Sequence, residues 1–255
     1  MRRKKFRSVS ILLAGPESRR LPGTYFVFLI LFSLPEVAIA DGVVIDSIYH
    51  PYVQQLEQEL EWRAVSQDDQ PGVGDGLQTH RFAYGRSLGE RWFGEVYLVG
   101  EKSDDDAFEV SGYELEASWQ ATERGEGWAD WGLVFEFEKE ANAAIWEFAT
   151  GILVEKEFGR WSGTANFFVA QEWGPDIPDE VESRLGLQAR YRYSRLLEPA
   201  IEFYSGQDTR GLGPVFLGQI NPGIKRQIKW EAGIIYGLDD RSPNETVRLL
   251  LELEF

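Results

Sequence analysis

The chain has 255 residues, of which 43% are hydrophobic and 14% aromatic, and it contains no cysteine. The absence of cysteine excludes zinc fingers, thiol catalysis, disulfide scaffolds and the lipid-modified cysteine of a bacterial lipoprotein. With 26 basic and 42 acidic residues, the chain has a formal charge of −16. Because nucleic-acid-binding proteins carry a basic surface, no nucleic-acid partner is expected.

Residues 1–40 have the pattern of a secretory signal peptide. Five basic residues fall within positions 2–7, a ten-residue apolar run follows at 25–34, and Ala38 and Ala40 provide the small residues of a cleavage site. The run is too short for an uncleaved anchor, since a membrane-spanning helix needs about 20 apolar residues. Cleavage after Ala40 leaves 19 basic and 40 acidic residues, a net charge of −21.

The mature chain is dominated by alternation of apolar and polar residues, the pattern of strands with one apolar face. Residues 41–53 are expected to form a periplasmic N-terminal segment. The first strand, 54–64, also fits a helix because Leu56 and Leu60 are four residues apart. The predicted strands are 54–64, 77–86, 92–101, 108–120, 129–138, 145–157, 161–172, 182–193, 196–205, 214–221, 225–237 and 246–255.

These strands predict an all-β fold, a closed antiparallel transmembrane β-barrel of about 12 strands (10–12) over residues 54–255. They cover far more of the chain than strands do in ordinary globular domains. Their connections mostly alternate between longer and shorter, as in outer-membrane barrels with long extracellular loops and short periplasmic turns. The alternative is a secreted β-sandwich with its aromatic residues in the core.

Tryptophan positions favour the barrel. Seven of the nine tryptophans fall near the ends of predicted strands, where amphipathic rings lie at the headgroup level of a membrane. A sandwich would bury its aromatic residues more evenly along the strands. The expected interface girdle comprises Trp62, Trp92, Trp119, Trp131, Trp146, Trp161 and Trp173.

The C-terminal strand resembles the assembly signal of Gram-negative outer-membrane β-barrel proteins. Alternating apolar residues lead to a final aromatic one: Val247, Leu249, Leu251, Leu253 and Phe255. The resemblance implies recognition by the barrel-assembly machinery, residence in the outer membrane of a Gram-negative bacterium, and contact with its lipid.

A second resemblance covers only the last quarter of the chain. Residues 212–215 (LGPV), 236–238 (YGL), 242–243 (SP) and 251–255 (LELEF) are similar to short motifs of outer-membrane proteins grouped with the meta-pathway of phenol degradation. This similarity implies transport of small molecules.

The polar faces of the strands are the expected functional surface, because in a barrel they point into the lumen. One interpretation is a lumen with an acidic wall and a basic strip that favours cations or dipolar solutes; the other is that these charges satisfy one another and plug the interior. Twelve strands lie between the roughly eight that leave a filled interior and the roughly 16 to 18 that leave an open channel. The expected lumen-lining residues are Arg184, Arg190, Arg192, Glu198, Glu202, Lys229, Glu231, Arg248 and Glu252.

Catalytic chemistry has little support. The histidines are His50 and His80, and no G-x-S-x-G motif is present. We therefore expect no enzymatic activity, no cofactor and no metal. The predicted function is a passive, porin-like channel or transporter for small solutes. The alternatives are a structural or surface-binding barrel with a plugged lumen and an outer-membrane hydrolase, which would need Ser or Asp beside His80.

Overall fold

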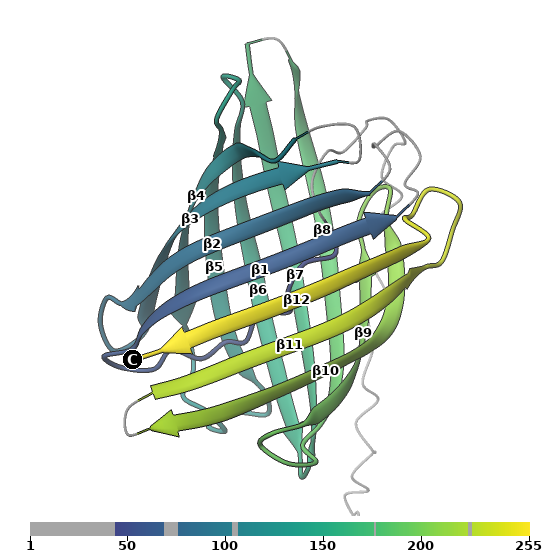
Figure 1. Ribbon diagram of the computed structural model, residues 1–255. Coiled ribbons are helices and arrows are strands. Elements are labelled where there is room, and N and C mark those ends of the chain that lie inside the picture. Colours follow the sequence, from purple (N-terminus) through teal and green to yellow (C-terminus); the bar gives the residue numbers. More distant parts are fainter. Residues whose placement is uncertain (1–43, 69–75, 104–106, 176, 224–225) are drawn as a thin grey trace, which may run out of the picture. The chain divides into compact units, whose positions relative to one another are not determined.

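A computed structural model of the chain describes residues 44–68, 76–103, 107–175, 177–223 and 226–255. The expected signal peptide, residues 1–40, lies outside this part, and no helix within it is long and apolar enough to cross a membrane. The elements are all strands (Figure 1): β1 (Gln58–Asp68), β2 (Leu77–Ser87), β3 (Trp92–Lys102), β4 (Glu109–Gln120), β5 (Asp130–Glu140), β6 (Trp146–Phe158), β7 (Trp161–Gly174), β8 (Ile177–Tyr191), β9 (Glu198–Ser205), β10 (Arg210–Gly223), β11 (Arg226–Gly237) and β12 (Glu245–Glu254).

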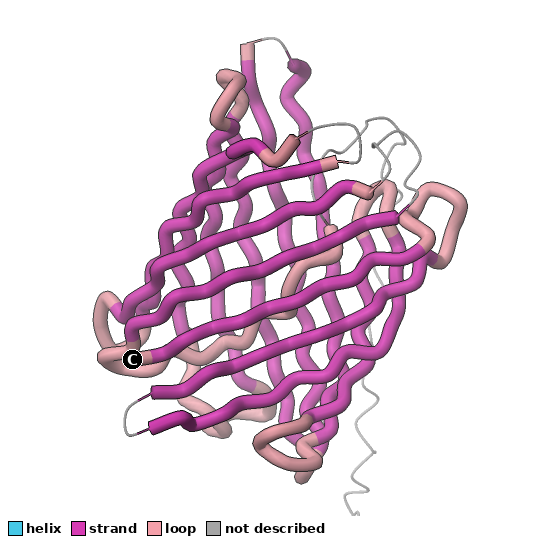
Figure 2. Tube along the Cα trace, viewed as in Figure 1, coloured by secondary structure: helices cyan, strands magenta, loops and turns pink. Residues whose placement is uncertain are grey.

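The twelve strands close into one antiparallel barrel (Figure 2). Each strand pairs with its neighbours in sequence, and β1 closes the ring by pairing with β12. Trp62, for example, lies opposite Phe82 of β2 on one side and Leu251 of β12 on the other. The predicted fold class and strand number are confirmed, and closure leaves no unpaired strand edge. A secreted sandwich is excluded.

The barrel has an apolar exterior and a polar interior. In β12, Val247, Leu249, Leu251 and Leu253 point outward and are 36–47% exposed. The intervening Arg248, Leu250 and Glu252 point inward and are at most 9% exposed. This is the reverse of a water-soluble domain, and it is the arrangement that a lipid environment requires of a strand.

Several strand boundaries differ from the prediction; β10, for example, begins at Arg210 rather than at residue 214. β1 begins at Gln58 rather than at residue 54, because Leu56 has a left-handed backbone (φ 65°) that interrupts extended structure. The predicted loop at 173–181 is mostly strand, since β7 continues to Gly174 and β8 begins at Ile177. The polar stretch 178–180 has the composition of a loop, but ladder hydrogen bonds do not depend on apolar side chains.

Six of the seven predicted girdle tryptophans lie at the strand ends. We call the end of the barrel that holds Gln58 and Phe255 the terminal end, and the opposite one the distal end. At the terminal end, Trp92 stacks on Trp119 with ring centroids 6.0 Å apart, Trp131 contacts Trp128 at 6.0 Å, and Trp161 contacts Tyr191 at 5.0 Å. Trp146 and Trp173 pair at the distal end.

Trp62 departs from this pattern. It was expected to end the first strand, but β1 runs on to Asp68, so Trp62 lies within the strand. It points outward, and its ring stacks on His80 with centroids 6.0 Å apart. Its indole nitrogen also donates a hydrogen bond to Nδ1 of His80 at 3.3 Å. His80 is therefore held on the outer wall of the barrel rather than in the lumen.

Candidate functional site

The chain's own N-terminal segment lies inside the barrel (Figure 2). We call residues 44–53 the lumen segment. Ile45 and Ile48 are 0% and 3% exposed and pack against inward side chains of the barrel wall: Ala200, Tyr204, Val215, Leu217 and Ile235. The segment was expected to lie in the periplasm; its described part, residues 44–53, occupies the lumen instead.

Two inward-facing glycines make room for this segment. A Cβ at Gly186 would come within 2.6 Å of the Cδ1 of Ile48, and a Cβ at Gly132 within 3.0 Å of Pro51. Real Cβ atoms do not approach other heavy atoms that closely without displacing them, so larger residues here would push the segment away from the wall. The barrel interior is thus shaped around the segment.

Side-chain amides of the wall satisfy the backbone of the lumen segment. Asn166 accepts a hydrogen bond from the Tyr49 N–H at 2.7 Å and donates one to the Tyr49 carbonyl at 2.9 Å. Gln120 accepts a hydrogen bond from the Val53 N–H at 2.9 Å. Because buried backbone groups must find partners, these amides replace the ladder that an irregular segment lacks.

Charged and aromatic side chains add further anchors. Asp46 of the lumen segment lies 3.3 Å from Arg63 of β1 and 3.9 Å from Arg81 of β2. Burial works to raise the pKa of the Asp46 carboxyl, but Arg63, Arg81 and Arg248 outweigh it and lower this pKa below its ordinary value. The Asp46 carboxyl is therefore ionised at neutral pH, and its ion pairs hold the segment to the first two strands.

Further along the lumen segment, His50 and Tyr52 contact strands on another part of the barrel's inner surface, β5 and β6. Nδ1 of His50 lies 2.5 Å from the carboxylate of Glu155 on β6. The Tyr52 hydroxyl donates a hydrogen bond to Asp130 of β5 at 2.8 Å. The segment is thus attached to β1, β2, β4, β5, β6 and β7, so its position is determined by contacts around the lumen.

Arg248 is the centre of a buried polar cluster. Its Nε and one terminal nitrogen bind the two carboxylate oxygens of Glu202 at 3.0 and 2.7 Å, and its other nitrogen lies 2.8 Å from Glu231. Glu202 also accepts hydrogen bonds from Tyr204 at 2.7 Å and Gln188 at 2.8 Å. Arg248 and Glu202 are 2% and 0% exposed. The cluster joins β8, β9, β11 and β12 across the inside of the barrel.

Arg184 and Arg190 of β8, and Arg192 directly after it, have carboxylate partners on both sides. Arg190 lies 3.5 Å from Glu198 of the neighbouring β9 and 3.6 Å from Glu155 of β6. Arg192 binds Glu157 at 2.8 Å. Arg184 binds across the lumen face to Glu136 of β5 at 3.0 Å. Glu202 of β9 binds Arg248 rather than one of these arginines.

Lys229 has the same kind of environment nearer the terminal end. Its ammonium group lies 2.7 Å from Glu252 and 3.9 Å from Glu57, and it also binds Glu254. All nine residues predicted to line the lumen therefore point inward, and each has a partner of opposite charge.

A cavity of about 820 Å³ remains in the lumen toward the terminal end. We call it the chamber. One side is an acidic wall on β1, β3 and β4, formed by Glu59, Glu61, Glu95 and Glu116. The basic side chains that line it come mainly from β8 and two terminal turns: Arg124, Arg190, Arg192 and Arg195. A smaller space of about 40 Å³ lies beside Asp46, Tyr49 and Arg184. The lumen segment lines both spaces.

Comparison with known proteins identifies the fold. No family model matches the chain, and no curated protein matches its sequence. Among solved structures, an outer membrane channel from Pseudomonas putida F1 superposes with a TM-score of 0.56 at 13% identity, over 86% of this chain and all of the other. The KdgM porin superposes with a TM-score of 0.50 at 10% identity, over 77% of this chain and 98% of the other.

The fold is that of an outer-membrane β-barrel. This confirms the first of the two resemblances seen in the sequence at the level of fold. The narrower resemblance to the meta-pathway proteins stays a prediction, as do the assembly signal at residues 247–255 and the interface girdle.

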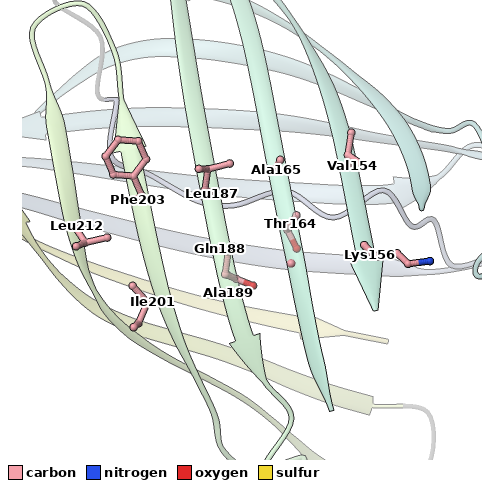
Figure 3. A pocket seen from close by; sticks show the side chains of 11 residues that line it. Val154, Lys156, Thr164, Ala165, Leu187, Gln188, Ala189, Ile201, Phe203 and Leu212 are labelled. Carbon is pink, nitrogen blue, oxygen red and sulfur yellow. The ribbon is translucent and has the colours of Figure 1, made fainter. Parts of the chain in front are cut away.

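The exterior of this outer-membrane barrel carries a shallow apolar groove of about 380 Å³ (Figure 3). Outward side chains of β6–β10 line it, including Val154, Leu187, Ile201 and Leu212. Because it faces the hydrocarbon side of the wall, we interpret it as lipid-contact surface.

Several lumen residues were missed by sequence reasoning. Arg63 was not assigned to the lumen although it is two residues from Glu61 and shares its face of β1; it is 5% exposed. Arg81 lies on the inner face of β2, and it was missed because apolar and polar residues alternate only weakly along that strand. The lumen segment has the length of a linker and does not alternate, and its one signal is the apolar face that Ile45 and Ile48 give it.

Replacing Asn166 with alanine should loosen the lumen segment. Asn166→Ala removes both hydrogen bonds to the Tyr49 backbone, and leaving buried amide groups unpaired costs about 1–3 kcal/mol. We expect faster amide hydrogen exchange over residues 44–53, measured by mass spectrometry on the folded protein. Asn142→Ala, at an exposed position in the β5–β6 loop, is the matched control. Equal exchange in both variants would contradict this anchoring role.

Proposed function

We propose that the mature protein is a passive channel of the Gram-negative outer membrane for small polar solutes, with the lumen segment limiting passage. The supporting observation is the chamber, a cavity of about 820 Å³ lined by both carboxylates and guanidinium groups, with the acidic wall on β1, β3 and β4. A solute with a positive charge, or with separated positive and negative groups, matches that arrangement. The Pseudomonas putida F1 protein of similar fold is itself an outer membrane channel, which agrees with the proposal.

The position of the lumen segment suggests how passage is limited. The chamber is lined by terminal-end turn residues such as Arg124 and Arg195 and by segment residues from Ser47 to Tyr52. Toward the distal side lies the smaller space of about 40 Å³ beside Asp46 and Arg184. A solute that crosses the whole barrel must therefore pass beside the segment or displace it.

The charge of the basic strip should set ion selectivity. In a planar bilayer, Arg184→Gln/Arg190→Gln/Arg192→Gln should shift the reversal potential toward greater cation preference, because three cations leave the lumen. The control is Arg86→Gln/Arg160→Gln/Arg226→Gln, which makes the same charge change at exposed positions. Equal reversal potentials in the two triple variants would contradict this lining, and a silent bilayer with correctly folded wild-type protein would contradict the channel.

A structural or solute-binding barrel is the second candidate, and the many anchors of the lumen segment favour it. In that case wild-type protein would not conduct, while solutes would still bind in the chamber.

We propose no enzymatic role. His80, the histidine considered for a hydrolase, lies on the outer wall against Trp62, and His50 is bound to Glu155. Membrane lipid and the barrel-assembly machinery remain the proposed partners.

A further inference from the structure

We propose that the acidic wall of the chamber binds a hard divalent cation, for which Ca²⁺ is the best match. The ligands would be Glu59 and Glu61 of β1 and Glu95 of β3, whose oxygens gather together, with Glu116 of β4 beside Glu95 at the edge of the site. These residues are between 5% and 8% exposed. The inference does not depend on passage of solutes through the barrel.

The wall brings three carboxylates from two separated strands together. One oxygen from each of Glu59, Glu61 and Glu95 lies within 4.8 Å of the others. Since neighbouring strands are about 4.8 Å apart, the backbones of β1 and β3 are roughly 10 Å apart. The side chains must therefore lean across β2 to meet.

Gly85 of β2 makes this approach possible. It lies between Glu59 and Glu95 in the strand register. A Cβ at Gly85 would come within 2.7 Å of the Phe93 ring and 2.9 Å of the Glu95 Cγ. The missing side chain leaves space that Phe93 and Glu95 share, so a glycine in β2 allows Glu95 to approach the β1 carboxylates.

Glu116 supplies an independent indication of a ligand. It lies directly opposite Glu95 on the next strand and lines the same chamber. One carboxylate oxygen accepts a hydrogen bond from Ser118 at 3.2 Å. The other, Oε2, is buried and has no hydrogen-bond partner among the described residues. Leaving a buried carboxylate oxygen without a partner costs free energy, and a cation bound at this oxygen would remove that cost.

The charges around the wall leave it short of cations. Arg63 binds Glu61 at 2.6 Å but also contacts Asp46. Within the described part of the chain, Glu59, Glu95 and Glu116 form no ion pair with lysine or arginine. Other lumen carboxylates do have such partners: Glu114 with Arg81, Glu136 with Arg184, and Glu252 and Glu254 with Lys229. A divalent ion would offset the unpaired charge.

The oxygen ligands and the space favour Ca²⁺ over other ions. Ca²⁺ accepts 6–8 oxygen ligands in irregular geometry, whereas Mg²⁺ needs a near-ideal octahedron. Carboxylates alone do not favour softer transition metals. The chamber leaves room for water to complete the coordination.

The test is calorimetric titration of folded, EDTA-treated mature protein in detergent with CaCl₂ at pH 7.5. We expect one site in the wild type and binding at least about tenfold weaker in Glu95→Gln and in Glu116→Gln, since even outer-shell changes cost 10–100-fold. Glu90→Gln makes the same charge change at an exposed position in the turn between β2 and β3, outside the chamber, and should leave Ca²⁺ affinity unchanged. Both wall variants should fold, because each removes a repelling charge.

The proposal is overturned if the wild-type protein takes up no Ca²⁺, since the wall would then be neutralised by protons. It is also overturned if Glu95→Gln and Glu116→Gln bind Ca²⁺ as tightly as Glu90→Gln, because the ion would then lie outside the acidic wall. A heat-modifiability gel on each variant excludes loss of fold as the cause of weak binding. The titration does not measure conductance. Failure of the protein to conduct ions in a planar bilayer would therefore count against the channel and not against the Ca²⁺ site.

Discussion

Deleting residues 44–53 should convert the barrel into a more open channel, with a severalfold higher single-channel conductance than the full mature chain. The deletion removes the apolar contacts of Ile45 and Ile48 and empties the middle of the lumen. Twelve strands enclose more space than the roughly eight whose side chains fill the interior. Water and ions should occupy the space that the lumen segment leaves.

The barrel should survive this deletion because its charged residues keep other partners. Arg63 retains Glu61, and Arg81 retains Glu114. Glu155 loses His50 but keeps Arg190 and Thr164. Planar-bilayer recordings measure the conductance, and a heat-modifiability gel confirms the fold. Unchanged conductance in a folded deletion variant would show that the segment does not limit passage.

Replacing Arg248 with glutamine should cause the largest loss of stability of any single lumen substitution proposed for this protein. Arg248→Gln leaves the fully buried Glu202 and its neighbour Glu231 without their cation. Removing one partner of a buried ion pair costs about 3–5 kcal/mol. Urea unfolding in lipid vesicles, followed by tryptophan fluorescence, should report a lower midpoint.

Two comparisons separate this effect from a general loss of charge. Arg226→Gln makes the same change at the exposed start of β11 and should leave the midpoint almost unchanged. Adding Glu202→Gln to Arg248→Gln removes the uncompensated carboxylate and should restore part of the stability. If Arg248→Gln unfolds at the same urea concentration as Arg226→Gln, the buried cluster does not stabilise the barrel.

The barrel wall was predictable because its signal is local. A strand in a barrel wall with an apolar exterior must alternate between outward apolar and inward side chains. In β12 the outward Val247, Leu249 and Leu251 alternate with the inward Arg248 and Leu250. The strand number followed from counting such segments. The two strands of the β7–β8 hairpin were predicted, but its distal extension was missed. Pro178 and Glu180 carry no apolar alternation there, and Glu180 is held by backbone pairing with Glu172.

The contents of the lumen were less predictable because they depend on contacts between residues far apart in sequence. Tyr49 and Asn166 are 117 residues apart, and either residue alone indicates nothing about the other. The apolar–polar alternation along the strand assigns Glu202 to the lumen, but only the three-dimensional structure shows that it binds Arg248 rather than a β8 arginine. Alternation therefore predicted which side chains point inward and could not predict their partners.

The position of the lumen segment is tested most directly by a disulfide between Ile48→Cys and Gly186→Cys. The chain has no cysteine of its own, and a Cβ at Gly186 lies 2.6 Å from the Ile48 side chain. Ile48→Cys with Leu187→Cys is the control, because Leu187 faces outward on the same strand. We predict that mild oxidation of the folded protein cross-links the first pair and not the second. Absence of the cross-link, with both thiols of the first pair open to a membrane-impermeant maleimide, would contradict an occupied lumen.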